Sequence, residues 1–347
     1  MNFPLFVRWL LWPFSFLFGV FVRMRAWCYR VGILTAKSLR QPAISIGNLT
    51  IGGTGKTPLV LWLAQRLQAQ GKRVGILSRG YRGDGRATWP GASKASSKEI
   101  PSDEVRLLAG RLRLPIGVGA NRYRTALAME PEKIEVFLLD DGFQHLRLAR
   151  DLDIVLVDAT NPFGGGWLLP AGPLREPHSA LSRADIVVIT RSEHALAVET
   201  LVRRHSSAPI FYAQTRLAAV LERSQPLPGG RTVDAQVHRY LAFCGIGNPR
   251  AFRDDLSRWG IKVLGSTFFR DHHRYTQREA DQLERLAAAM GADGLLCTEK
   301  DVFNLEGVNF KSLPVHFCRI DMNLNNVEAF LSIVRETLNR SAARTPK

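Results

Sequence analysis

Residues 52–57, a short glycine-rich segment, constrain the fold more than any other part of the chain. The segment reads Gly-Gly-Thr-Gly-Lys-Thr, with a β-branched run at 43–47 before it and an amphipathic stretch at 58–70 after it. A bound phosphate chain needs unobstructed backbone N–H groups, the positive end of a helix, a lysine ammonium and a hydroxyl for Mg²⁺, and this segment supplies each. The order strand, loop, helix therefore predicts a nucleotide site of the P-loop type.

We expect contacts with the nucleotide along the whole loop. The usual pattern begins with a glycine where this chain has Thr50, but Gly52 and Gly53 leave the loop free to bend. An ordinary glycine-rich turn is the alternative. The residues that we expect to hold the phosphates are Thr50, Ile51, Gly52, Gly53, Thr54, Gly55, Lys56 and Thr57, of which Thr57 also faces Mg²⁺.

Short β-branched runs alternate with amphipathic stretches after residue 42. Such alternation predicts right-handed crossovers and a mostly parallel sheet with helices on both faces, an α/β fold of the P-loop NTPase type. The runs lie at 43–47, 73–78, 134–140, 153–159, 184–190 and 209–214.

The alternating pattern weakens around 215–238, a polar stretch with Pro226 and Pro228, and resumes at 240–247. We therefore expect a P-loop core at 42–214, a linker at 215–238 and a second, smaller α/β domain at 239–347. In that domain we predict helices at 249–258, 276–290 and 325–339, the last packing back on the core, and strands at 261–267, 293–298 and 314–319.

The first 41 residues combine apolar and basic character. Leu5–Val22 is interrupted by only two polar side chains, Arg8 and Ser15, and includes two Trp and five Phe. From Met1 to Gly83 there are 12 basic residues and no acidic one, within a chain of formal net charge +16. Cationic and aromatic side chains together are typical of a segment attracted to acidic lipid. We expect 1–41 to be a membrane-association segment.

Several arrangements of this segment are open. A transmembrane span is marginal in length, and Pro13 favours a helix that lies in the interface of the cytoplasmic leaflet. A helix buried against the rest of the protein would show the same periodicity. A cleaved signal peptide fits poorly, because no Lys/Arg-rich start and no small-residue cleavage site accompany the apolar run.

Acidic residues stand where a parallel sheet places its ligands. Asp140 and Asp141 close the run at 134–139, and carboxylates at the carboxyl end of a strand face the ligand crevice. Beside a phosphate loop, one of them is expected to contact Mg²⁺ directly or through water, while the spacing leaves open which. Arg175, in the rigid run at 170–177, is placed to grip a phosphate.

Two further groups carry both structural and catalytic interpretations. Asp103 and Glu104 open a helix, where acids complement the helix dipole and Ser102 is a candidate N-cap. The triplet 271–273, Asp-His-His, follows a predicted strand of the second domain and fits an ordinary surface loop.

The landmarks taken together resemble one family, the tetraacyldisaccharide 4′-kinases, which are the lipid A kinases of Gram-negative bacteria. The resemblance covers nearly the whole chain, including the apolar, basic N-terminus. The matching pieces, in family order, are SIGNLTIGGTGKTP at 45–58, SRGYRG at 78–83, SDEVRLLA at 102–109, LLDDGFQHLRLARDLDIVLVDA at 138–159, GGWLLPAGPLREP at 165–177, AFCGIGNPRAF at 242–252, FRDHHRYT at 269–276 and CTEKD at 297–301.

This resemblance implies transfer of the ATP γ-phosphoryl group to the 4′-hydroxyl of a tetraacylated glucosamine disaccharide 1-phosphate. The implied cofactors are ATP and Mg²⁺, and the implied location is the cytoplasmic face of the inner membrane. The positive charge then attracts a phosphorylated lipid substrate and an acidic membrane surface, and no nucleic acid is expected as a partner.

The resemblance also implies roles for single residues. Asp140 and Asp141 match the acidic pair at the metal, Asp103 matches the group that accepts the hydroxyl proton, and His272 matches its partner in a dyad, with His273 as the competitor. Further motif residues, whose individual roles the resemblance does not define, are Glu104, Arg122, Gln144, His145, Arg175, Glu176 and Lys300. After Asp301 the chain continues Val-Phe-Asn, where the family leads us to expect a small residue and a further lysine.

Since Asp103 lies in the predicted core and His272 in the predicted second domain, we expect their dyad to form only when the two domains close.

Two other functions remain as alternatives. A membrane-attached P-loop GTPase or ATPase switch shares the loop and the acids, but the chain has no guanine-reading [NT]-K-x-D sequence, and TEKD at 298–301 is its nearest string. A nucleic-acid binder would explain the charge and leave the phosphate loop unexplained.

Overall fold

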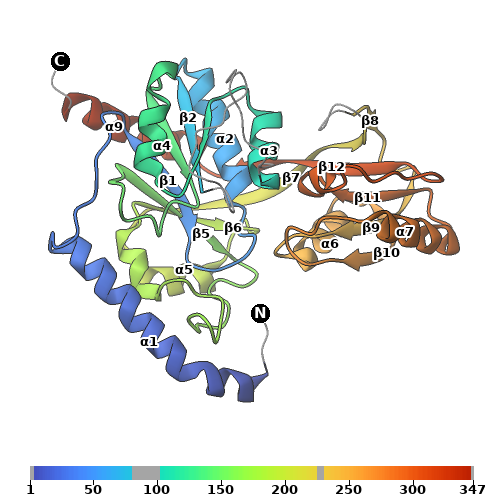
Figure 1. Cartoon of the computed structure of the whole chain (residues 1–347), viewed down its shortest axis with the longest axis horizontal. Coiled ribbons are helices and arrows are strands. Elements are labelled where there is room, and N and C mark those ends of the chain that lie inside the picture. Colours follow the sequence, from blue (N-terminus) through green and yellow to red (C-terminus); the bar gives the residue numbers. More distant parts are fainter. Residues whose placement is uncertain (1–3, 80–101, 225–229, 345–347) are drawn as a thin grey trace. The chain divides into compact units, whose positions relative to one another are not determined.

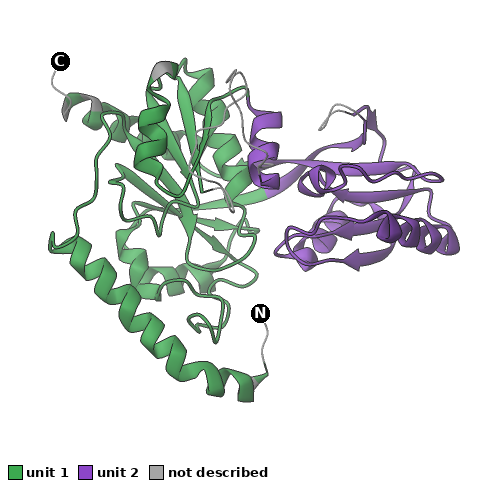
Figure 2. Ribbon diagram, viewed as in Figure 1, with its two compact units in different colours: residues 1–99, 113–214, 323–347 green, residues 100–112, 215–322 purple. Residues whose placement is uncertain are grey.

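The structure, a computed structural model, describes residues 4–79, 102–224 and 230–344. Residues 80–83 of the SRGYRG motif therefore lie outside the described residues. The chain divides into two compact units (Figure 2). Unit 1 comprises residues 1–99, 113–214 and 323–347, and unit 2 comprises residues 100–112 and 215–322.

Unit 1 contains a parallel sheet whose central strands are buried along their whole length. Apolar β-branched and leucine side chains on both faces explain why helices must cover both sides. The strand order is β7 (Ile210–Glu222), β6 (Ile186–Thr190), β5 (Leu152–Asp158), β1 (Ala43–Asn48), β4 (Val136–Asp140), β2 (Val74–Ser78) and β3 (Ile116–Val118). The predicted α/β fold with a mostly parallel sheet is confirmed.

Helices pack on this sheet from either side (Figure 1). One side carries the side chains of α4 (Arg122–Ala128), α5 (Leu196–Arg203) and the 3₁₀ segment η2 (His178–Arg183). The other carries α2 (Lys56–Ala69), which contacts β1, β2 and β4, and α9 (Val327–Arg344). The Phe330 ring of α9 is fully buried, with its centroid 5.6 Å from Trp62 of α2 and 5.2 Å from Phe211 of β7.

Unit 2 contains the remaining strands of the sheet order and two hydrophobic clusters. Helix α7 (Gln277–Met290) covers one cluster and α6 (Pro249–Arg258) covers the other. The strands run in the order β10 (Lys262–Phe268), β9 (Arg239–Cys244), β11 (Gly294–Thr298) and β12 (Val315–Leu324), with β7 beside β12 and β8 (Thr232–Val233) antiparallel to β7. Two short helices, α3 (Asp103–Arg111) and α8 (Glu299–Asn304), pack against each other.

Strand β7 continues to Glu222, whereas the sequence pattern placed its end at residue 214 and a linker after it. Both faces of its second half find apolar partners in unit 2, since Val220 belongs to one hydrophobic cluster and Leu221 to the other. Consecutive apolar residues at 217–221, which reach both clusters, lack the alternation of polar and apolar residues that would have revealed a strand.

Helix α1 (Leu5–Arg30) is longer than the apolar run predicted, and it continues through Pro13 into the basic residues. Large apolar side chains stay exposed along it; Phe6 is 73% and Trp9 63% exposed. At 1.5 Å per residue its 26 residues extend about 39 Å, enough to cross a hydrocarbon core of about 30 Å. Among the described residues it is the one helix long and apolar enough to do so.

The interpretation of α1 as a helix buried inside the protein is wrong, because only 11% of its most apolar window is buried. One face of α1, which includes Ser15, contacts unit 1. The Ser15 hydroxyl donates to the carbonyl of Leu168 at 3.0 Å and accepts from the backbone N–H of Ala171 at 2.9 Å. The remaining apolar surface is what a membrane-associated helix presents.

The packing of α9 generates a stability prediction. Phe330→Ala is expected to lower the free energy of unfolding by about 3–5 kcal/mol, because it removes a buried ring and leaves a cavity beside Trp62 and Phe211. Leu196→Ala, at a side chain that is 63% exposed, is the control and should change stability by no more than about 0.5 kcal/mol. Thermal unfolding in detergent measures both; equal effects would contradict this account of α9.

Candidate active site

The glycine-rich loop between β1 and α2 has the backbone that a phosphate site requires. Gly52 and Gly55 adopt φ values of 125° and 89°, which L side chains rarely tolerate, and Gly55 is the N-cap of α2. Outward-facing groups hold the loop in place. The backbone N–H of Ile51 donates to the Pro173 carbonyl at 2.8 Å, and the Thr190 hydroxyl donates to the Thr54 carbonyl at 3.0 Å. These contacts use the Ile51 N–H and the Thr54 carbonyl, and they leave the N-terminal end of α2 open to an anion.

Lys56 stands at the start of α2 between two oxygen groups. Its ammonium donates to Asn48 Oδ1 at 3.1 Å and lies 3.5 Å from Asp141 Oδ1. The Arg175 guanidinium donates to Asp141 Oδ2 at 2.6 Å. Burial alone would raise the pKa of Asp141, but Lys56 and Arg175 outweigh burial and hold that pKa at about 2. Asp141 is therefore a carboxylate at any physiological pH.

Asp140, the last residue of β4, is buried at 3% exposure, and its carbonyl accepts from Arg122 Nη2 at 3.3 Å. Among the described residues no cluster of three or more His, Cys, Asp and Glu side chains is placed to hold a metal ion. The set fits a Mg²⁺ that takes most of its oxygen ligands from nucleotide phosphates and water, with the Thr57 hydroxyl and an acid at the end of β4 completing it.

Gln144 connects the phosphate loop to α1. Its side-chain amide donates to the carbonyl of Asn48 at 2.9 Å, and its backbone carbonyl accepts from Arg25 Nη2 at 3.2 Å. The next residue, His145, has a pKa lowered to about 4 by burial and then by nearby arginines, of which Arg122 contributes most. His145 is therefore neutral near pH 7 and offers an uncharged imidazole.

A second cluster lies in unit 2 around Asp103, the first residue of α3, which is 5% exposed. The His272 Nδ1–H donates to this carboxylate, at 2.9 Å from one oxygen and 3.0 Å from the other. Asn304 Nδ2 donates to it at 3.2 Å, and the Lys300 ammonium is 3.8 Å away. Asp103 is thus ionised, with two side-chain donors on its carboxylate and the Lys300 charge facing it.

The two members of this dyad perturb each other. The hydrogen bond to Asp103 raises the pKa of His272 above its ordinary value, against the effect of burial. Burial would raise the pKa of Asp103, but the hydrogen bond from His272 and the charge of Lys300 lower it. Nδ1 of His272 binds Asp103, and the other ring nitrogen, Nε2, lies 3.8 Å from Asp271 Oδ2, in a side chain that is 43% exposed.

Asp103 and His272 both belong to unit 2, so their hydrogen bond does not require the two units to approach. This differs from our expectation that the dyad forms only when two domains close. Helix α3 belongs to unit 2, where Arg106 donates to the Phe303 carbonyl at 2.9 Å. Arg111 adds an ion pair to Glu299 of α8 at 2.9 Å. These contacts, and not the position of α3 in the sequence, determine its unit.

His273, the competitor for the histidine role, is engaged elsewhere. Its Nε2 donates to Glu279 Oε1 at 3.0 Å, and its ring stacks on Phe269 with centroids 4.7 Å apart. His272 adopts a left-handed φ of 59°, so the two consecutive side chains leave the turn in different directions. The structure brings His272, and not His273, to Asp103.

The TEKD run is mostly structural. Thr298 and Asp301 form a capping box at the start of α8, and the buried Asp301 also accepts from Gly245 N–H at 2.7 Å. Lys300 is the exception, since its ammonium lies 3.2 Å from Glu104 and faces Asp103. Glu176, another motif residue, accepts from Arg183 at 2.8 Å.

Two polar residues of the candidate site were missed by the sequence analysis. Asn48 ends β1 and positions Lys56, and Asn304 ends α8 and binds Asp103. Asn48 stands next to the phosphate loop, which is a usable signal. Asn304 was noted only as a departure from the expected motif, and nothing near it in the sequence points to Asp103.

Comparison with known proteins gives consistent matches over the chain. A family model described as tetraacyldisaccharide-1-P 4′-kinase matches residues 7–339. A tetraacyldisaccharide 4′-kinase of Geobacter sulfurreducens is 41% identical, covering 88% of this chain and 86% of that protein, and one of Syntrophus aciditrophicus is 38% identical, covering 94% of each. The crystal structure of "apo" form LpxK from Aquifex aeolicus in complex with ATP has a TM-score of 0.73 at 31% identity, covering 96% of this chain and 99% of that one.

The Asp103–His272 pair allows a prediction that needs no substrate. Asp103→Asn removes the charge that favours protonated His272, so the pKa of His272 should fall. By linkage, a raised histidine pKa stabilises the folded state fully at pH values below the unfolded pKa of about 6.5, and this stabilisation is lost as pH rises through the folded pKa. NMR titration of the His272 ring measures the shift. Glu104→Gln is the matched control, because it leaves the Asp103 contact in place; an equal fall in both variants would contradict the assignment.

Proposed function

The chain belongs to the tetraacyldisaccharide-1-P 4′-kinase family, and on that premise we propose that it transfers the γ-phosphoryl group of ATP to the 4′-hydroxyl of tetraacyldisaccharide 1-phosphate. It is an ATP-dependent kinase of lipid A biosynthesis. The family match favours this activity over the membrane-attached nucleotide switch. The observation that carries the proposal is the phosphate loop with Lys56 paired to Asp141 at the carboxyl end of the parallel sheet.

ATP is supported by the loop geometry and by the related structure that was solved in complex with ATP. We assign the phosphates to residues 50–57, with Lys56 moving its charge from Asp141 to the β and γ oxygens. Mg²⁺ would be held through Thr57 and the pair Asp140 and Asp141, and it would supply charge neutralisation at the phosphates. Arg175, now held by Asp141, is placed to join Lys56 in stabilising the transferred group.

At the acceptor, the hydroxyl oxygen forms its bond to the γ phosphorus as the bond between that phosphorus and the bridging oxygen breaks, and ADP leaves. The proton of the hydroxyl passes to Nε2 of His272. Asp103 holds the opposite ring nitrogen and stabilises the imidazolium that results. The raised pKa of His272 makes it a better base than a free imidazole, and Lys300 and Asn304 fix the carboxylate.

We further propose that α1 places the enzyme on the cytoplasmic face of the inner membrane, where ATP and a membrane-embedded lipid are both accessible. The exposed apolar side chains of α1 and the basic residues 23–40 support this location. The same features account for the high positive charge without a nucleic-acid partner.

The activity is tested by radiolabelled phosphate transfer from ATP to the disaccharide 1-phosphate lipid in detergent micelles with Mg²⁺. Lys56→Ala should reduce label in the bisphosphorylated lipid by roughly 10²- to 10³-fold, because a charge on the transferred group is lost. Lys72→Ala, an exposed lysine beyond the other end of α2, is the control and should keep full activity. Label found only as free phosphate, whatever lipid is present, would refute the kinase and support the switch.

The dyad is tested in the same assay. His272→Ala and Asp103→Ala should each lower kcat on the order of 10²- to 10⁴-fold, since proton transfer loses its acceptor or the group that orients it. His273→Gln should change kcat only slightly, because that residue packs against Phe269 and Glu279. Wild-type turnover in Asp103→Ala, with the fold checked by circular dichroism, would remove the dyad from the mechanism.

A further inference from the structure

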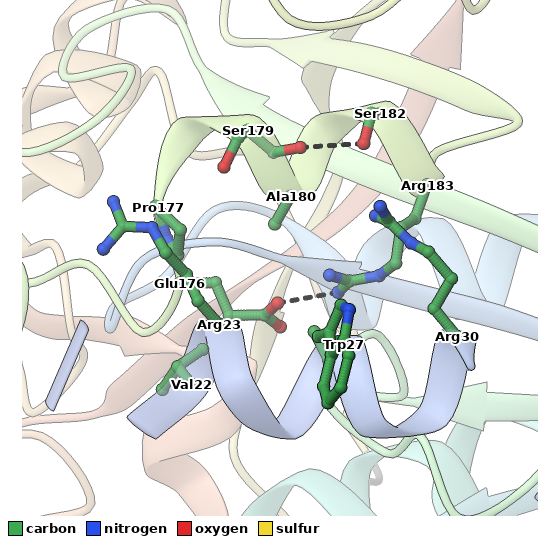
Figure 3. A pocket seen from close by; sticks show the side chains of 11 residues that line it. Val22, Arg23, Trp27, Arg30, Glu176, Pro177, Ser179, Ala180, Ser182 and Arg183 are labelled. Atoms are coloured by element: carbon green, nitrogen blue, oxygen red, sulfur yellow. Dashed lines mark hydrogen bonds and ion pairs between the residues drawn. The ribbon is translucent and has the colours of Figure 1, made fainter. Parts of the chain in front are cut away.

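A hollow of about 190 Å³ lies in unit 1 between the last two turns of α1 and the segment 176–183. Figure 3 shows the side chains that line it. At about 30 Å³ for each water molecule of liquid volume, it has room for about six waters, or a small polar headgroup. None of the phosphate-loop residues 50–57 lines it, nor does either member of the dyad.

The charge of this hollow is mainly positive. Arg183 Nη2 donates to Glu176 Oε2 at 2.8 Å, so these two charges compensate each other. Arg23 and Arg30 of α1 line the same hollow and have no carboxylate within 4 Å among the described residues. Two uncompensated guanidinium groups suit a bound phosphate, which Arg recognises through paired N–H donors.

Two buried polar atoms in the hollow lack hydrogen-bond partners among the described residues. They are the Nε donor of Arg183 and the Oε1 acceptor of Glu176, whose side chain is 5% exposed. Buried polar groups are rarely left unpaired unless something else satisfies them. A ligand that brings a phosphate oxygen for Arg183 and a hydroxyl for Glu176 would satisfy both.

The position of the hollow along α1 indicates its depth in a membrane. The exposed apolar side chains run from Phe6 to Trp27, and the hollow begins where Arg23 and Arg30 appear. Trp27, which is 53% exposed, lines it. Indole rings and arginines together mark the level of lipid headgroups. In Figure 3, Arg30 and Arg183 converge above Trp27.

We propose that this hollow binds a lipid headgroup through a phosphate held by Arg30 and Arg183 and a neighbouring hydroxyl held by Glu176, while Arg23, whose guanidinium lies near Gly19 and Pro177, adds positive charge at the other end of the hollow. Two lipids carry this chemistry: an acidic glycerophospholipid of the bilayer, such as phosphatidylglycerol, and the phosphorylated end of the disaccharide substrate. The second source rests on the proposed function, whereas the first requires only that the protein meets a membrane.

The binding test uses the full chain in micelles of an uncharged detergent, titrated with short-chain phosphatidylglycerol. Tryptophan fluorescence should change to saturation, and Trp27→Phe should lose that part of the signal. Arg23→Gln/Arg30→Gln should weaken binding by at least about tenfold. Arg204→Gln/Arg285→Gln removes the same charge at two exposed positions outside the hollow and should bind as the wild type does. Short-chain phosphatidylcholine, which has no headgroup hydroxyl, should bind at least about tenfold more weakly.

Two further measurements identify which of the two lipids occupies the hollow. If the substrate lipid displaces phosphatidylglycerol, and Arg23→Gln/Arg30→Gln raises KM for that lipid with kcat retained, the hollow holds the substrate phosphate. If both lipids bind together and KM is unchanged, it holds a bilayer lipid. Absence of saturable binding, equal binding of both phospholipids, or equal loss in the control variant would overturn the site. Only the KM comparison depends on turnover; saturable binding, phospholipid preference and the control variant are measured without it, so a failure of the kinase assay remains distinguishable from a failure of the site.

Discussion

One carboxylate, that of Asp141, determines the arrangement of the nucleotide site. It binds Lys56 at the start of α2 and Arg175 in the segment after β5, so it joins three stretches that are far apart in the chain. Arg175 also donates its backbone N–H to the Leu49 carbonyl, which ties the same segment to the phosphate loop. Charges buried in this way are stable only when paired, so the cations must remain close to Asp141 until a phosphate replaces it as their partner. The site is thereby assembled before the nucleotide arrives.

The dyad in unit 2 follows the same rule, with a second carboxylate held by positively charged and N–H donor groups. Asp103 is buried, and it remains ionised because His272, Asn304 and Lys300 all face it. The positions of these partners come from packing: α3 on α8, and a left-handed turn at His272. Burial strengthens each interaction because the local dielectric is low. The carboxylate that anchors the dyad is therefore inaccessible, and the imidazole is the part that a substrate meets.

Local sequence patterns predicted much of this structure. The features that were not predicted depend on contacts between residues far apart in the sequence. The phosphate loop, the strand-end acids and the parallel sheet all depend on short stretches whose chemistry is complete in itself, and the sheet was predicted correctly. The length of β7 was missed because residues 217–221 are consecutively apolar and show no strand-like alternation. The unit to which α3 belongs depends on Arg106 and Arg111 reaching α8, nearly two hundred residues later. Asn304 was missed for the same reason, because its hydrogen bond to the distant Asp103 carboxylate cannot be inferred from the residues around it in the sequence.

The attachment of α1 to unit 1 affects how this enzyme would encounter lipid molecules. Ser15 fixes the helix to the segment 168–171, and Arg25 fixes it to Gln144, which in turn touches Asn48 beside Lys56. Hydrogen bonds at two places along α1 thus fix the helix to unit 1. On the proposed membrane location, an enzyme held to a bilayer through α1 would diffuse in two dimensions, with its phosphate loop kept near the lipid surface by these contacts.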